Sequence, residues 1–144
     1  MSSIYPPIDA ARATTSMELR VRFAETDLMG IAHHSSYLLY FEAGRVEWLR
    51  ARGVTYADWA AKGVQLPVVE ANLLYKAPAR FDDLLTVEAT LVELRSVSFK
   101  FAYRVKRGEH LLVEGHTRLA CIDAQHGLLK IPEDMREVLL SPGR

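Results

Sequence analysis

The chain has 144 residues, of which 49% are hydrophobic and 25% are charged, and its 18 basic residues balance its 18 acidic ones. This length and composition are typical of one globular domain and exclude a disordered chain, which needs low hydrophobicity and a high net charge. The zero net charge argues against a nucleic-acid-binding protein, and no apolar run reaches the ~18 residues of a membrane span. The single cysteine, Cys121, lies in an apolar segment, where we expect a buried, inert thiol, and it favours a reducing cytoplasm.

The first residues of the chain carry no periodic pattern. Residues 1–13 lack the apolar block of a secretory signal, and we expect residues 1–15 to form a loose N-terminal leader. Residues 16–144 then make up a single domain. Its first strand is indicated by apolar residues that alternate with polar ones, at the period of a half-buried strand. These apolar residues are Met17, Leu19, Val21 and Phe23.

A loop and a long helix follow this strand. Residues 24–36 break the alternation and are rich in polar residues, which predicts a loop. Ser35 or Ser36 is suited to cap a helix over residues 37–52, which ends in basic residues before Gly53. The first two turns of this helix are apolar on nearly all sides. Because one five-stranded sheet cannot cover such a helix, we expect a second subunit to cover the rest.

The remainder of the chain is predicted to consist mainly of strands. After a short helix over residues 56–62, we expect four strands joined by short turns, which favour antiparallel neighbours, and a closing helix. The strands cover residues 66–76, 84–94, 97–105 and 110–123, and the helix covers residues 132–140. Phe99, Phe101 and Tyr103 share one face of their strand, which indicates core rather than a platform for nucleobases. The fold class is therefore α+β, with a five-stranded antiparallel sheet and the long helix on its apolar face.

The loop carries the most unusual group of side chains, which are Glu25, Asp27, His33 and His34. They precede a helix N-terminus, where N–H groups without intrahelical partners carry partial positive charge. These N–H groups can stabilise an oxygen that becomes negative in a transition state, and a carboxylate upstream can act as nucleophile or general base. In the alternative interpretation, Asp27 and the serines only cap the loop and the helix, and the histidines are solvated.

The run from Arg22 to Arg45 resembles the signature of hotdog-fold acyl-CoA thioesterases. It is most similar to the branch that contains 4-hydroxybenzoyl-CoA thioesterase and the Tol-Pal-associated thioesterases. The shared pattern is Thr-Asp-x-x-Gly at Asp27 and Gly30, then His-x-x-Tyr at His34 and Tyr37, then a helix that bears Glu and Arg. The resemblance covers roughly residues 17–140. It implies a hotdog fold, in which a five-stranded antiparallel sheet wraps around one long central helix.

The resemblance also implies a reaction and the residues that perform it. The chain would hydrolyse a CoA thioester to free acid and CoA, with Asp27 attacking the carbonyl or activating a water molecule. His34 takes part in catalysis, and N–H groups at the start of the helix near Tyr37 hold the oxyanion. Gly30 and Ile31 are expected to contact the substrate. No metal or cofactor is implied, because a thioester is already activated. The family builds its site between two subunits, so we expect a homodimer or a homotetramer.

Glu42 is the second candidate for the catalytic base, because some hotdog enzymes place the catalytic acid on this helix. Glu42 and Arg45 lie three residues apart, within pairing distance on a helix. We expect Glu42 to lie among the substrate-binding residues, as a buried carboxylate that pairs with Arg45 or with a neighbouring subunit.

A basic segment follows in the strand region. Residues 95–107 contain five basic residues and no acidic one, namely Arg95, Lys100, Arg104, Lys106 and Arg107. Such a patch suits phosphate groups, and the resemblance assigns the nucleotide part of CoA to basic residues near the third and fourth strands. We therefore predict that Arg95, Lys100 and Arg104 bind the coenzyme, whereas the alternative is a solvated sheet face. Lys76 and Arg80 are further phosphate candidates.

Two other functions remain open. The chain could be a hotdog hydratase or dehydratase that acts on acyl thioesters, or a hotdog protein that binds acyl-CoA or a partner without turnover. Release of free thiol from acyl-CoA separates a thioesterase from a hydratase. A non-catalytic protein would tolerate the loss of Asp27 with its ligand affinity intact.

Overall fold

The structure is a computed structural model that describes residues 8–143. Along the chain its elements are β1 (Thr14–Arg20), the short 3-10 helix η1 (Phe23–Glu25), α1 (Ser36–Arg50), α2 (Tyr56–Ala61), β2 (Val68–Tyr75), β3 (Leu84–Leu94), β4 (Ser98–Arg107), β5 (His110–Ala120) and α3 (Glu133–Leu140). Every predicted strand and helix is present, and the bounds agree to within about three residues. Within the described residues, no helix is long and apolar enough to cross a membrane.

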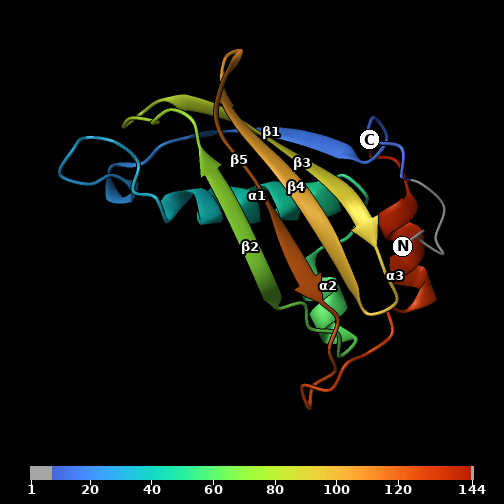
Figure 1. The fold of residues 1–144 in the computed structure, drawn as a ribbon. Helices are drawn as coiled ribbons and strands as arrows, with labels where there is room; N and C mark the ends of the chain where they lie inside the picture. Colours follow the sequence, from blue (N-terminus) through green and yellow to red (C-terminus); the bar gives the residue numbers. More distant parts are fainter. Residues whose placement is uncertain (1–7, 144) are drawn as a thin grey trace.

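The five strands form one antiparallel sheet in the order β1-β3-β4-β5-β2, so β1 and β2 lie at its edges (Figure 1). Helix α1 runs along one face of this sheet and contacts β1, β3 and β4. The predicted α+β hotdog fold, with a five-stranded antiparallel sheet around one long helix, is thereby confirmed. The arrangement also brings the C-terminal end of the edge strand β2 close to the beginning of α1.

The core fills the space between α1 and the sheet. On β4, Phe99, Phe101 and Tyr103 are buried, which confirms the predicted inner face of this strand. Phe41 of α1 stacks on Tyr103 with ring centroids 4.2 Å apart, and Trp48 meets Phe101 edge to face at 4.9 Å. Close-packed aromatic contacts of this kind fix the position of α1, and with it the position of the loop that precedes the helix.

The N-terminal part of the chain is more ordered than expected. Strand β1 begins at Thr14, because Thr14 and Thr15 pair with β3. The predicted leader included both threonines and therefore extends two residues too far, while its residues 1–7 lie outside the described part of the chain. Ala13 is also buried, and its carbonyl accepts a hydrogen bond from Trp48 Nε1 at 2.8 Å.

The predicted inner face of β1 ends earlier than its alternation suggests. Val21 is buried as expected, but Phe23 lies in η1 and is 77% exposed, so the prediction for Phe23 is wrong. The physical reason is the turn that follows Val21, in which the Glu25 N–H donates to the Arg22 carbonyl and replaces strand pairing. The Phe23 ring instead packs edge to face on Phe81, with centroids 5.9 Å apart.

Candidate active site

Asp27 and Gly30 form the two ends of a tight turn. The Gly30 N–H donates to the Asp27 carbonyl at 3.0 Å, and Gly30 has a φ of 77°, a left-handed conformation that favours glycine. The Asp27 N–H donates to the Ile31 carbonyl at 3.0 Å. In the Asp27 carboxylate, Oδ1 accepts from the Met29 N–H at 2.8 Å, and Oδ2 has no partner among residues 8–143. The turn thus holds the carboxylate by one oxygen and leaves the other oxygen available to a ligand.

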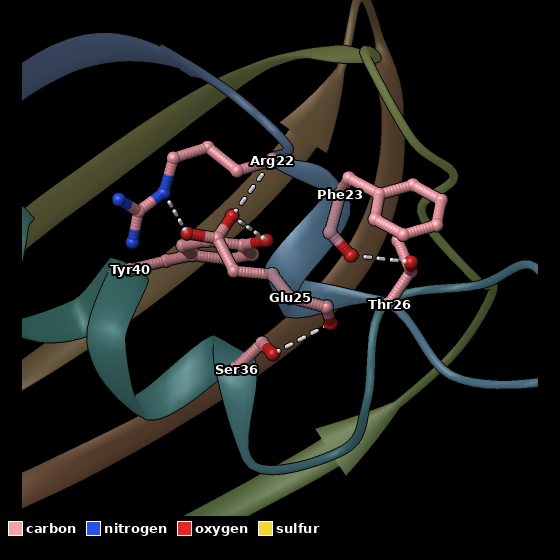
Figure 2. A network of polar contacts seen from close by, with 6 residues as sticks. All are labelled: Arg22, Phe23, Glu25, Thr26, Ser36 and Tyr40. Atoms are coloured by element: carbon pink, nitrogen blue, oxygen red, sulfur yellow. Dashed lines mark hydrogen bonds and ion pairs between the residues drawn. The ribbon is translucent and has the colours of Figure 1, made fainter.

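Glu25, the last residue of η1, is the centre of a buried polar network (Figure 2). Its carboxylate accepts hydrogen bonds from the Arg22 N–H at 2.8 Å, from Arg22 Nε at 2.6 Å and from the Tyr40 hydroxyl at 2.9 Å. Its carbonyl accepts from the His33 N–H and from the Ser36 hydroxyl, both at 2.8 Å. Glu25 therefore ties η1 to both the loop and α1.

The charge state of this network follows from its contacts. Burial raises the pKa of the Glu25 carboxyl, but the hydrogen bonds from Arg22 and Tyr40 outweigh burial, so the net pKa lies below its ordinary value. Burial, together with the neighbouring carboxylate, raises the pKa of Tyr40. Glu25 is thus ionised and Tyr40 protonated at neutral pH, and the hydrogen bonds between them are charge-assisted. Through these contacts Glu25 stabilises the loop and its attachment to α1.

Helix α1 begins without the serine side-chain cap that the sequence predicts. Ser35 occupies the N-cap position, but its side chain makes no capping hydrogen bond, because its backbone angles are already helical rather than extended. His33 takes over part of this role, since its Nδ1 accepts from the Ser35 N–H at 3.2 Å and contacts Ser35 Oγ at 2.7 Å. His33 is exposed, as expected for a solvated histidine, but its ring is also tied to the helix start.

Two backbone N–H groups at this helix start remain available. The Ser36 and Leu38 N–H groups donate to carbonyls of the loop, at 2.9 and 3.1 Å. By contrast, the His34 and Tyr37 N–H groups have no acceptor among residues 8–143. N–H groups at a helix N-terminus carry partial positive charge and can hold a developing oxyanion.

An open pocket of about 380 Å³ lies beside the turn and the helix start. Four of the predicted site residues line it, namely Asp27, Ile31, His34 and Tyr37. The other lining residues are Met29, Ala32, Tyr75, Lys76, Ala77 and Pro78. The Tyr37 hydroxyl accepts from the Ala79 N–H at 3.1 Å, and burial raises its pKa, so the Tyr37 side chain is a neutral part of the wall. The pocket combines a carboxylate and backbone N–H donors with mostly apolar walls.

None of these six residues is assigned to the pocket by the sequence, and two of them, Tyr75 and Lys76, carry polar groups. The sequence predicts Lys76 only as a phosphate candidate and indicates no role for Tyr75. Tyr75 is the last residue of β2 and Lys76 follows it. The Tyr75 hydroxyl donates to the His34 carbonyl at 2.8 Å, which brings this end of β2 to the start of α1. The only sequence signal was an aromatic and a basic residue just before Pro78, which does not locate them relative to Asp27.

Five predicted substrate-binding residues do not line this pocket: Gly30, Glu42, Arg95, Lys100 and Arg104. Gly30 shapes the turn that holds Asp27 rather than the pocket wall. Glu42 is exposed and borders a separate groove on the outer side of α1, next to Arg22 and Arg50. Within a single chain, Glu42 therefore lies apart from the turn that holds Asp27.

The predicted pair of Glu42 with Arg45 is wrong. Arg45 is buried on the side of α1 that faces the sheet, where it donates to the hydroxyls of Tyr103 and Tyr56 at 3.0 and 3.2 Å. Glu42 is neither buried nor within ion-pair distance of Arg45. The two side chains are close in sequence, but one reaches toward the core and the other toward solvent.

The basic segment of β4 is largely neutralised by neighbouring carboxylates. Three of its side chains form ion pairs, which join Arg95 to Glu93, Lys106 to Glu88 and Arg107 to Asp83. Lys100 and Arg104 form no ion pair among residues 8–143, and both line an open groove on the outer face of the sheet. The predicted phosphate patch is thus reduced to two unpaired cations.

Comparisons with known proteins agree with this geometry. Residues 21–139 match the model of the thioesterase-like superfamily. The acyl-CoA thioester hydrolase YbgC of Escherichia coli is 32% identical over 106 residues, which cover 73% of this chain and 79% of that protein. A hypothetical protein from Thermus thermophilus, whose crystal structure is known, is 44% identical in sequence. Its structure matches with a TM-score of 0.83 over 88% of this chain and 95% of that one. A DHNA-CoA thioesterase from Staphylococcus aureus is 25% identical with a TM-score of 0.83, over 87% of each chain. The chain therefore belongs to the thioesterase-like superfamily, as its motif predicts.

Proposed function

We propose that the chain is an acyl-CoA thioesterase, which hydrolyses a CoA thioester to a free acid and CoA. The observation that carries this proposal is the meeting of the Asp27 carboxylate with the free N–H groups of His34 and Tyr37 at one pocket. Family membership supports it, because the relative from Escherichia coli is named an acyl-CoA thioester hydrolase.

The proposed mechanism uses these groups on the thioester carbonyl. The His34 and Tyr37 N–H groups hold the carbonyl oxygen as it becomes negative. Asp27 either attacks the carbonyl carbon, giving a mixed anhydride that water then hydrolyses, or takes a proton from the water molecule that attacks. In both routes the C–S bond breaks, and CoA leaves as a thiolate that takes up a proton. The His34 imidazole lines the same pocket and orients the thioester.

The experiment that tests this function is a panel of acyl-CoA thioesters assayed for release of free thiol. We expect release from at least one thioester, with the free acid as the second product. Hydration or dehydration of the acyl chain without thiol release would identify a hydratase or dehydratase. Binding of acyl-CoA without any turnover would identify a non-catalytic protein.

Lys100 and Arg104 are proposed ligands of the CoA phosphates, with Arg95 as a weaker contributor because Glu93 already pairs with it. The groove that Lys100 and Arg104 line also presents the exposed side chains of Leu74 and Val92. Cations beside apolar surface suit the phosphates and the base of a nucleotide.

Substitution of Arg95, Lys100 and Arg104 by Gln should raise KM for acyl-CoA and leave hydrolysis of an N-acetylcysteamine thioester nearly unchanged, because that ester lacks the nucleotide. Exposed charge pairs are worth up to about 1 kcal/mol each, so we expect KM to rise by roughly 3- to 30-fold. Added salt should weaken acyl-CoA binding more in the wild type than in the variant. Equal effects on both esters would mean that Arg95, Lys100 and Arg104 do not bind CoA and belong to a solvated sheet face.

A homodimer or homotetramer is also part of the proposal. On α1, Leu38 is 40% and Leu39 is 52% exposed, on the side of the helix away from the sheet. Strand β2 is an edge strand, and its residues are exposed except for Leu73, which is partly buried. A second copy that covers both features would bury this apolar surface and pair the open edge. Light scattering at micromolar concentration should give at least a dimeric mass, and a monomeric mass would contradict this part of the proposal.

The compartment that we propose is the cytoplasm. Cys121 is the single cysteine of the chain, and it is fully buried, which agrees with the predicted buried thiol. Burial raises the pKa of this thiol, so it is protonated and unreactive at neutral pH. A free thiol without a disulfide partner in the chain fits a reducing compartment.

A further inference from the structure

Tyr75 makes the contact that joins β2 to the start of α1. It is the last residue of β2, and its hydroxyl donates to the His34 carbonyl at 2.8 Å. This is the only hydrogen bond to that carbonyl among residues 8–143. Figure 1 shows the end of β2 near the beginning of α1.

The Tyr75 ring is itself held in place by the pocket wall. It packs edge to face on Tyr37, with ring centroids 5.6 Å apart, and the Tyr37 hydroxyl in turn accepts from the Ala79 N–H. The Tyr75 side chain is 51% exposed and lines the same pocket as Asp27. Its hydroxyl therefore reaches the His34 carbonyl from the pocket wall, with the ring held against Tyr37.

Two other contacts restrain the peptide groups on either side of His34: the His33 carbonyl accepts from the Ser36 N–H at 2.9 Å, and the Ser35 N–H donates to His33 Nδ1 at 3.2 Å. The His33 N–H is also anchored, since it donates to the Glu25 carbonyl. Between these anchors the His34 N–H has no acceptor within the described part of the chain, and the His34 carbonyl accepts only from Tyr75 there. Loss of the Tyr75 contact would leave the peptide plane between His34 and Ser35 held only by the longer bond from the Ser35 N–H to the exposed His33 ring, at 3.2 Å. This plane would then tilt, and the His34 imidazole and N–H would shift with it.

We propose that Tyr75 is a positioning residue, whose hydroxyl fixes the His34 backbone so that the His34 N–H and imidazole face the thioester. The inference rests on the proposed thioesterase function and adds to it a role for the edge strand. Tyr75 acts through His34 and takes no proton itself. Because the bond is solvent-accessible, its contribution to global stability is small, whereas the orientation that it imposes matters during turnover.

The test is Tyr75→Phe, which removes only the hydroxyl and keeps the ring against Tyr37. Loss of a supporting contact to a catalytic group typically costs about 10-fold, so we expect kcat to fall by about 10-fold, with KM within about twofold of the wild type. The melting temperature should stay within about 2 °C, because one exposed hydrogen bond is lost. The matched control is Tyr56→Phe, which removes a tyrosine hydroxyl on α2 that does not line the pocket, and its kcat should be unchanged.

A spectroscopic readout separates positioning from a merely structural role. In an Asp27→Asn background, a bound thioester is not turned over, and its carbonyl stretching band reports the hydrogen bonds to the oxygen. Adding Tyr75→Phe should move this band back toward its position in water. A wild-type kcat and an unshifted band in the Tyr75→Phe proteins would overturn the inference while leaving the thioesterase function intact. An absence of thiol release from the wild type would instead count against the function itself.

Discussion

Two carboxylates that are two residues apart in the sequence, Glu25 and Asp27, have opposite environments. Glu25, at the end of η1, is only 8% exposed, and its carboxylate accepts three hydrogen bonds from Arg22 and Tyr40. Asp27, at the start of the neighbouring turn, is partly exposed, and its carboxylate accepts one hydrogen bond, from its own turn. The region around Glu25 is therefore fully bonded, whereas the region around Asp27 keeps an open oxygen at a pocket.

The difference shows how a single loop can provide both rigidity and reactivity. A buried carboxylate with every oxygen bonded stabilises the fold, because leaving it unpaired would cost its full desolvation. A carboxylate with a free oxygen at a pocket can attack or deprotonate a ligand, provided that its neighbours hold it still. Glu25 holds the loop through its backbone carbonyl, which binds the His33 N–H and the Ser36 hydroxyl.

The largest expected effect comes from Asp27→Asn. The turn keeps its Met29 hydrogen bond, because the amide oxygen can still accept it, so the fold and melting temperature should be unchanged. Removal of a central catalytic group typically costs two or more decades, so kcat for acyl-CoA should fall at least about 100-fold. The measurement is steady-state thiol release.

The matched control for this variant is Asp82→Asn. Asp82 is exposed, does not line the pocket, and adopts a φ of 66° that asparagine tolerates, so turnover should equal that of the wild type. Near-wild-type turnover in Asp27→Asn would remove Asp27 from the catalytic role. Glu42→Gln would then be the next variant to examine.

Glu25→Gln should lower the stability of the fold more than it lowers turnover, which is the reverse of Asp27→Asn. The neutral amide weakens the charge-assisted hydrogen bond from the buried Tyr40 hydroxyl, and a hydrogen bond to a charged group contributes about 1.5–3 kcal/mol. The ion pair with the exposed Arg22 side chain contributes little, because solvent screens it. We expect the free energy of unfolding in denaturant titrations to fall by about 2 kcal/mol. We also expect kcat to fall by less than in Asp27→Asn, since the Asp27 carboxylate, the proposed nucleophile or base, remains. A larger loss of kcat than in Asp27→Asn, with unchanged stability, would reverse the roles of the two carboxylates.

The pH dependence of stability sharpens the same comparison. The pKa of Glu25 is lower in the folded protein than its ordinary value of 4.5. The ionised carboxylate therefore stabilises the fold above about pH 4.5, and this stabilisation is lost as the pH falls through the folded-state pKa. The stability difference between the wild type and Glu25→Gln should be full at pH 7 and should shrink as the pH falls below 4.5. A difference that stays constant down to pH 3 would contradict the charge-assisted network.

Gly30→Ala should give the smallest effect. No atom lies within 4 Å of the added Cβ, so the cost comes from the left-handed φ of 77° and is roughly 1 kcal/mol. Because this strain falls on the turn that holds Asp27, kcat should fall a fewfold. The control is Gly63→Ala. Gly63 has the same open space around its Cβ position and a φ of 82°, but it lies after α2. This variant should lose a similar free energy of unfolding, and its kcat should equal that of the wild type. Equal kcat losses in both variants would remove the link between this turn and catalysis.

Some features of the site could be predicted from the sequence, and others could not. Asp27, Ile31, His34 and Tyr37 do line one pocket, because their spacing places them on one turn and the first residues of one helix. Their catalytic roles stay predictions that the variants above would test. The contribution of Tyr75 could not be predicted, because it depends on which strand lies at the edge beside α1. The burial of Glu25 and the separation of Glu42 from Arg45 depend in the same way on how α1 faces the sheet.

The sequence by itself determined the local elements, including the inner face of β4, the helix α1 and the glycine turn after Asp27. Each of these depends on residues two to four positions apart, so hydrophobic periodicity and turn chemistry are sufficient to specify them. Only the tertiary structure decided the strand order, the environment of Glu25 and the approach of β2 to the start of α1. These features join residues far apart in the chain, and their contacts exist only after the sheet has packed against α1 and buried the apolar faces of both.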